Sequence, residues 1–126
     1  MVMPTAVVSG LEALRRAGWI TQIPYLITVT VSAAHPIWQV DRFAVNVQEP
    51  EWFDVMAGGM QSGEGVALPF LAPGWALADL VGREGWCDCG IGPDDIYWDF
   101  VTTGDEQDWA DACAALGFGK LNMNPD

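Results

Sequence analysis

The chain has 126 residues, about half of them apolar, and its seventeen acids face five Lys and Arg, a formal net charge of −12. This length suits one domain with a sizeable core, and the apolar content excludes a chain disordered through low hydrophobicity. The charge disfavours contact with nucleic acid or anionic membrane and favours basic protein surfaces. Because no run of eighteen apolar residues occurs, the sequence predicts no transmembrane helix.

The first predicted element is a short helix over residues 9–17, where a Ser and a Glu three residues later fit a capping box. Leu14 is expected to point into the core, while Glu12, Arg15 and Arg16 are expected to face solvent. The residues before this helix lack the basic stretch of a secretory signal, so we expect a cytoplasmic protein.

Two strands are predicted next, over residues 25–33 and 37–47, because both stretches are rich in β-branched residues. In the first strand, Ile27, Val29 and Val31 share one face, and the Thr and Ser residues on the other face are expected to be solvated. A turn at 34–36 and a bulge at 41–42 would join the two strands as an antiparallel hairpin.

The middle of the chain predicts two more helices and one short strand. A helical segment begins at Pro50, a glycine-rich loop covers residues 58–65, and a helix follows Pro73 to about Gly82. Residues 66–71 suit a short strand, and Pro69 within it favours the edge of the sheet. The loop over residues 85–93 leads into an acidic stretch.

Residues 93–111 contain seven acids, no Lys or Arg, and four aromatic side chains. Alternation over 96–101 predicts a strand with Ile96, Trp98 and Phe100 on its apolar face. Thr103 and Glu106 fit the capping box of a final helix. That helix would carry an apolar stripe, and Gly117 would end it. The stripe consists of Trp109, Ala112, Cys113 and Leu116.

Two interpretations of the acidic stretch stay open: the acids solvate a helix start and a surface, or they bind a basic partner. Acidity can also reflect a salt-rich habitat or a GC-rich genome. If the stretch binds a partner, the candidate contact residues lie in the turn before the strand, on the second face of the strand and on the helix. They are Asp94, Asp95, Tyr97, Asp99, Asp105, Glu106, Asp108 and Asp111.

Catalytic and metal chemistry have weak support in the sequence. Cys87, Cys89, Cys113 and His35 are formally a zinc ligand set, but their spacing is not that of a zinc site. His35 precedes a Pro in a predicted turn and has no nucleophile motif nearby, so we expect no catalytic residues and no cofactor. An acid-pair enzyme or divalent-metal site formed by Asp94, Asp95 and Asp99 remains an alternative.

These patterns predict a single α+β domain over residues 1–126, with an antiparallel sheet of three to four strands and helices packed on one face. For function we expect a small acidic, non-enzymatic inhibitor that binds the basic surface of a nuclease or another nucleic-acid-binding complex. A phage anti-CRISPR or DNA-mimic protein and a toxin-immunity protein are the classes that fit the charge. The alternative is an assembly module that forms a homo-oligomer through exposed aromatic and apolar surface.

Overall fold

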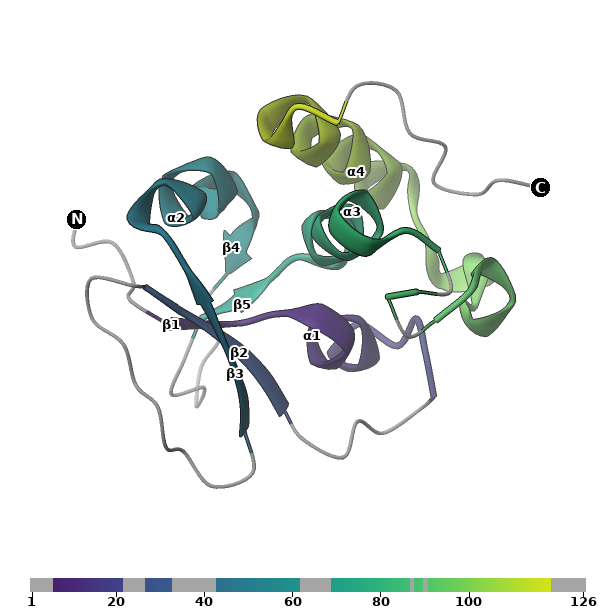
Figure 1. The fold of residues 1–126 in the computed structure, drawn as a ribbon. Helices are drawn as coiled ribbons and strands as arrows, with labels where there is room; N and C mark the ends of the chain where they lie inside the picture. The colour runs from purple at the N-terminus through teal and green to yellow at the C-terminus, as the bar shows by residue number, and fades with distance from the viewer. Residues whose placement is uncertain are drawn as a thin grey trace.

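The computed structural model describes residues 6–21, 27–32, 43–61, 69–86, 88–89 and 91–118. These residues form an α+β fold in which a five-stranded sheet has helices against one face (Figure 1). The strands are β1 (Ala6–Val8), β2 (Ile27–Ser32), β3 (Phe43–Gln48), β4 (Met60–Gln61) and β5 (Phe70–Leu71), in the order β3-β2-β1-β5-β4. The helices are α1 (Gly10–Arg16), α2 (Pro50–Met56), α3 (Pro73–Glu84) and α4 (Thr103–Leu116).

The α+β class is confirmed, but the prediction of an antiparallel sheet with three to four strands is wrong. The sheet is mixed: β1 pairs antiparallel with β2 and parallel with β5, while β4 and β5 are antiparallel. The predicted hairpin is also wrong, since β2 and β3 are parallel and in register from Ile27 beside Phe43 to Ser32 beside Gln48. The predicted turn and bulge lie in 33–42, outside the described residues.

Chain length explains why a parallel pair is possible here. A six-residue strand is about 20 Å long, and the ten residues between β2 and β3 can span up to roughly 33 Å. The chain can therefore return to the start of β2 before it begins β3. The edge prediction for Pro69 also fails, because β5 lies between β1 and β4, and the Pro69 carbonyl accepts a hydrogen bond from the Val8 amide (2.9 Å).

The two faces of the sheet differ in chemistry. Val8, Val29 and Val31 form a small buried cluster on one face, and Val7 contributes to the main core with the helices on the other. Thr30 is paired with Val7 and therefore shares the helix-facing side. The expectation that the Thr and Ser residues of β2 are solvated is wrong at Thr30 and Ser32, which are buried.

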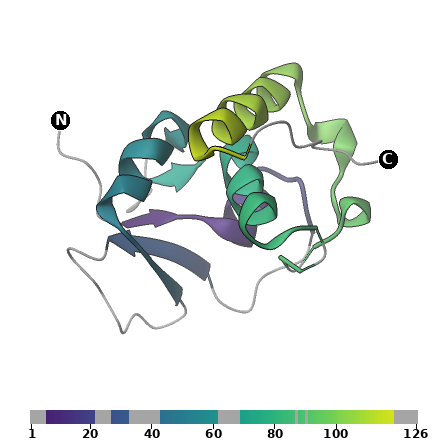
Figure 2. The same ribbon diagram turned by 45° about the horizontal axis from the view of Figure 1, so that its top comes forward.

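The helices stack in the order α1, α3, α4, with α2 beside α4, as both ribbon views show (Figures 1 and 2). Helices α2 and α3 begin at Pro50 and Pro73 as predicted, because proline lacks the amide that a first helical position leaves unpaired. In the part of the chain that the structure describes, no helix is both long and apolar enough to cross a membrane.

Small residues let α4 lie close to α3. Gly74, Ala78 and Gly82 are four residues apart along α3 and so lie along one side of it. A Cβ on Gly74 would lie 2.7 Å from the Asp105 carbonyl oxygen of α4, and one on Gly82 would overlap the ring of Phe118. The close approach of these two helices therefore depends on glycine.

Part of the predicted glycine loop is ordered structure. Gly58 and Gly59 belong to a 3₁₀ turn over Ala57–Gly59, and Met60–Gln61 form β4; residues 62–68 lie outside the described part. A Cβ on Gly59 would overlap the indole of Trp75, so the absence of a side chain lets that ring pack against the turn.

Candidate protein-binding surface

The segment before α4 is a pair of tight turns, and the predicted strand over 96–101 is wrong. Pro93–Asp95 and Trp98–Phe100 each form a short 3₁₀ helix. The Asp95 carboxylate accepts a hydrogen bond from the Gly92 amide (2.8 Å), which closes the first turn. Ile96 is buried although it lies in no strand. The apolar alternation over residues 96–101 therefore arises from turns that direct some side chains inward.

Phe100 was expected on the buried face and instead lies at the surface. Its side chain is 61% exposed and that of Tyr97 is 47% exposed, while Trp98 is half-buried. The Tyr97 and Phe100 rings meet edge to face with centroids 6.2 Å apart. Phe100 is absent from the predicted contact residues, although the acids on both sides of it indicate that this stretch is not core.

The residue that caps the final helix lies one position earlier than predicted. Thr102 is the cap: its hydroxyl accepts from the Asp105 amide (3.1 Å), and the Asp105 carboxylate accepts from the Thr102 amide (2.9 Å). The predicted pair, Thr103 and Glu106, is therefore wrong by one position, because each neighbouring Thr has an acid three residues later. The helix end at Gly117 is confirmed, with its φ of 79° in the left-handed region.

The apolar stripe of α4 packs inward as predicted, and its acids lie on the remaining surface. Trp109, Ala112 and Cys113 are buried. Glu106 and Asp111 are exposed, and Asp111 accepts a hydrogen bond from Gln107 Nε2 (2.9 Å).

Asp108 is half-buried and lies among like charges. Its partial burial, followed by repulsion from Asp105 and Asp111, raises the pKa of this carboxyl. Negative charge is therefore concentrated along this side of α4.

We call the predicted contact residues the acidic face. The structure places them on two consecutive stretches, the turns over 93–100 at the right of Figure 1 and helix α4 at its top. Asp95 and Asp105 already serve the backbone as caps. Asp94, Asp99 and Glu106 are exposed without such a role in the described residues, so they have the most freedom to meet a partner.

The described arginines do not neutralise this surface, because they pair with buried carboxylates elsewhere. Glu12 was expected to face solvent, but its side chain is buried and holds both Arg15 (2.7 Å to Nη2) and Arg16 (3.0 Å to Nε). The side-chain hydrogen bond from Arg15, working against burial, leaves the pKa of Glu12 below its ordinary value. The prediction that Glu12 faces solvent is wrong because an acid within reach of two arginines can be buried as part of an ion-paired cluster.

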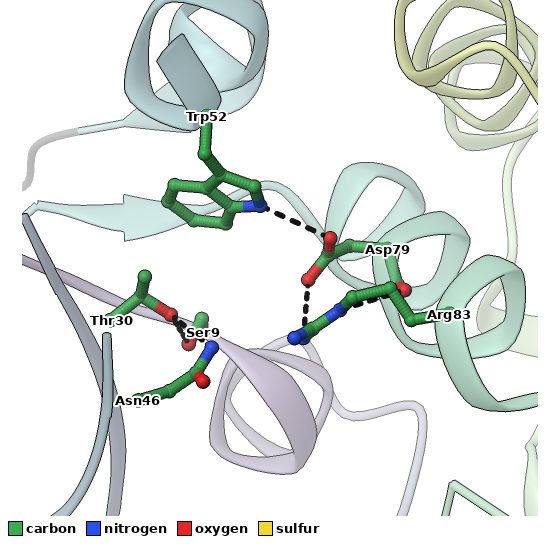
Figure 3. Close-up of polar contacts among 6 residues, drawn as sticks. All are labelled: Ser9, Thr30, Asn46, Trp52, Asp79 and Arg83. Atoms are coloured by element: carbon green, nitrogen blue, oxygen red, sulfur yellow. Dashed lines mark hydrogen bonds and ion pairs between the residues drawn. The ribbon is translucent and has the colours of Figure 1, made fainter. Parts of the chain in front are cut away.

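The buried Asp79 pairs with the third described arginine, Arg83, whose side chain is partly exposed (Figure 3). Its carboxylate accepts from Arg83 Nη2 (2.8 Å) on the same helix and from the Trp52 indole (3.2 Å) on α2. Burial raises the pKa of Asp79, and the two donors oppose that shift. These contacts join α2 to α3 and satisfy the buried carboxylate.

A second polar cluster links β2 and β3 to Ser9, which lies between β1 and α1. The hydroxyls of Ser9 and Thr30 are 2.8 Å apart, and the Asn46 amide approaches Thr30 Oγ1 at 3.4 Å (Figure 3). Ser9 precedes α1 but caps no amide with its side chain, so the predicted capping box there is wrong. The hydroxyl instead satisfies Thr30 in the interior.

The described carboxylates other than Glu12 and Asp79 are exposed or half-buried. They are Glu49, Glu51, Asp54, Glu84, Asp88, Asp94, Asp95, Asp99, Asp105, Glu106, Asp108 and Asp111. Several lie on α2 and α4, which are adjacent in both ribbon views (Figures 1 and 2). The described part of the helical layer thus presents carboxylates outward and keeps its arginines engaged with buried acids.

The formal zinc ligand set of three cysteines and His35 cannot be assembled from the described residues. His35 and Cys87 lie outside them, and Cys89 and Cys113 are free, buried thiols. Cys89 Sγ contacts the Ile91 carbonyl oxygen (3.5 Å), and burial raises the pKa of Cys113. No group of three His, Cys, Asp or Glu side chains suited to a metal occurs within the described ranges.

Comparison with known proteins gives no assignment. The sequence matches no protein-family model. No curated protein matches it significantly either. Any function must therefore be argued from the chemistry of the surface itself.

Proposed function

We propose that this protein is a small, non-enzymatic inhibitor whose acidic face covers a basic, nucleic-acid-binding surface of another protein. The observation that carries the proposal is the carboxylate-rich surface of the turns and α4, with Tyr97 and Phe100 exposed within it. An anti-CRISPR or DNA-mimic protein of a phage and a toxin-immunity protein are the classes that fit. A cytoplasmic location is part of the same proposal.

Charge would act first, by steering a basic partner toward this surface. Electrostatic steering raises association rates, and these fall as salt screens the charges. The pairing of Arg15, Arg16 and Arg83 with the buried Glu12 and Asp79 supports this role, since the described cations are engaged outside the acidic face. Asp105 and Asp111 repel the Asp108 carboxylate, and a basic partner bound here would relieve that repulsion.

Tyr97 and Phe100 would supply the apolar contact of the interface, which charged residues do not provide. Hot spots in interfaces are enriched in Tyr and Arg and lie in desolvated centres surrounded by polar residues. An exposed Tyr97 and Phe100 bordered by acids have this composition.

The acids around Tyr97 and Phe100 disfavour a homo-oligomer whose interface is formed by these two side chains. A twofold interface brings one surface patch against its own copy, so acids beside Tyr97 and Phe100 would oppose acids. Like charges placed opposite each other cost several kcal/mol.

The test is capture on the immobilised protein from bacterial lysate at about 0.1 M salt, followed by elution at about 1 M salt, where screening shortens from roughly 10 Å to roughly 3 Å. We expect a nuclease or nucleic-acid-binding complex in the eluate, and we expect the protein to compete with nucleic acid for it.

Two charge variants make the test specific. One neutralises the acidic face at Asp94→Asn, Asp99→Asn, Glu106→Gln and Asp111→Asn, and its capture of the partner should be lost. The control makes the same change in net charge on exposed acids elsewhere, at Glu49→Gln, Glu51→Gln, Asp54→Asn and Glu84→Gln. Equal capture by both variants would show that the acidic face is not the binding surface.

A further inference from the structure

Tyr97 and Phe100 form a small aromatic platform that the protein core does not use. They are the large hydrophobic side chains exposed in the described residues, and their rings lie at an interplanar angle of 83°. Edge-to-face contact fixes the two rings against each other and leaves aromatic surface open to solvent.

The backbone beneath the platform is held in place from several sides. The Tyr97 amide donates to the Trp19 carbonyl oxygen (2.8 Å), and the Phe100 amide donates to the Tyr97 carbonyl oxygen (3.0 Å). The Trp98 indole donates to the Pro93 carbonyl oxygen (3.0 Å), and its ring meets Trp86 edge to face. A surface fixed in this way loses little conformational entropy when it binds.

Carboxylates adjoin the platform within the same two turns. Asp99 lies between the two aromatic residues in the 3₁₀ helix over Trp98–Phe100, and Asp94 precedes them in the other turn; both acids are exposed. A ligand on this platform therefore meets flat aromatic surface and carboxylate oxygens together.

Arginine matches that combination better than lysine does. The guanidinium is planar, stacks on aromatic rings and donates paired hydrogen bonds to a carboxylate. The lysine ammonium is a strongly hydrated point charge that does not stack. Net charge alone would not distinguish the two. The carboxylates favour arginine through paired hydrogen bonds, and stacking on the rings adds to that preference.

We infer that Tyr97 and Phe100 are the anchor of the acidic face and select an arginine-bearing segment of the basic partner, with Asp94 and Asp99 pairing with the same side chains. This inference rests on the proposed function and names the chemistry of its partner.

The experiment uses labelled octa-arginine and octa-lysine peptides as probes, with binding followed by fluorescence anisotropy at low salt. The unmodified protein should bind octa-arginine about fivefold or more tightly than octa-lysine, because stacking on the rings and paired hydrogen bonds to the carboxylates both favour the guanidinium. The preference should fall in the double variant Tyr97→Ala, Phe100→Ala to the part that the carboxylates supply. It should fall equally in Tyr97→Leu, Phe100→Leu, which retains much of the apolar area and lacks the aromatic face.

Equal binding of the two peptides by the unmodified protein, or a preference that is undiminished in either double variant, would overturn the inference. A protein that sediments as a dimer and becomes monomeric in the Ala variant would also overturn it, by assigning the platform to a second copy. The variant with a neutralised acidic face should bind both peptides more weakly and keep the part of the preference that the rings supply. Failure of lysate capture with an intact arginine preference would instead reject the inhibitor role and leave the platform chemistry standing.

Discussion

Helix α4 carries half of the acidic face, and its position depends on the absence of a side chain at Gly74. A Cβ there would lie 2.7 Å from the Asp105 carbonyl oxygen, 2.9 Å from Asp108 Cβ and 3.0 Å from the Trp109 amide nitrogen. Two of these atoms belong to the α4 backbone, so a side-chain rotation cannot relieve the overlap. We therefore predict that Gly74→Ala forces α4 away from α3.

The cost follows from two opposing terms. Overpacking costs typically about 1–3 kcal/mol. Replacing glycine by alanine within a helix returns about 0.5–1 kcal/mol. We expect a net loss of about 1–2 kcal/mol in the free energy of unfolding.

Gly104→Ala is the matched control. Gly104 occupies the second position of α4 as Gly74 occupies that of α3, but it is exposed, and its added Cβ would come no closer than 3.6 Å to Thr102 Oγ1. Urea unfolding followed by tryptophan fluorescence should show Gly104→Ala unchanged or slightly more stable. If Gly74→Ala matches this control, α4 does not pack on α3 as described.

Two buried carboxylates should respond to pH in opposite directions. Glu12→Gln should lower the free energy of unfolding at neutral pH by about 1–3 kcal/mol, because two charge-assisted contacts weaken. With the folded-state pKa of Glu12 lowered, that difference should shrink as pH falls through it; a constant difference in urea titrations contradicts the pairing. The pKa of Asp79 is raised, so unfolding curves should show the unmodified protein gaining stability relative to Asp79→Asn as pH falls from neutral. The reverse slope would contradict its burial.

Helix positions were the most predictable part of the fold. Pro50, Pro73 and Gly117 mark helix boundaries through local backbone chemistry, which acts without knowledge of the tertiary structure. Strand pairing was not predictable in the same way. The valines of β2 produce the same alternation in a parallel or an antiparallel sheet, so only the path of the chain between β2 and β3 decides the direction.

Burial of polar residues was the least predictable feature. Glu12 and Thr30 look solvent-facing in the sequence, and both are buried with their polar groups satisfied. Arg15 and Arg16, one turn further along α1, pair with Glu12, and Ser9, distant in the sequence, pairs with Thr30. The composition of the acidic face could be predicted from its run of acids. Its shape could not, because the alternation around Trp98 suits a strand as well as the turns that are present.

The salt dependence of partner binding tests the central claim most directly. For the partner captured from lysate, we would measure Kd between about 0.05 and 0.5 M salt for the unmodified protein, the variant with a neutralised acidic face and its control. We predict that Kd rises steeply with salt for the unmodified protein and the control, and that the neutralised variant binds weakly with a shallower dependence. Identical salt dependence in all three proteins would contradict binding through the acidic face.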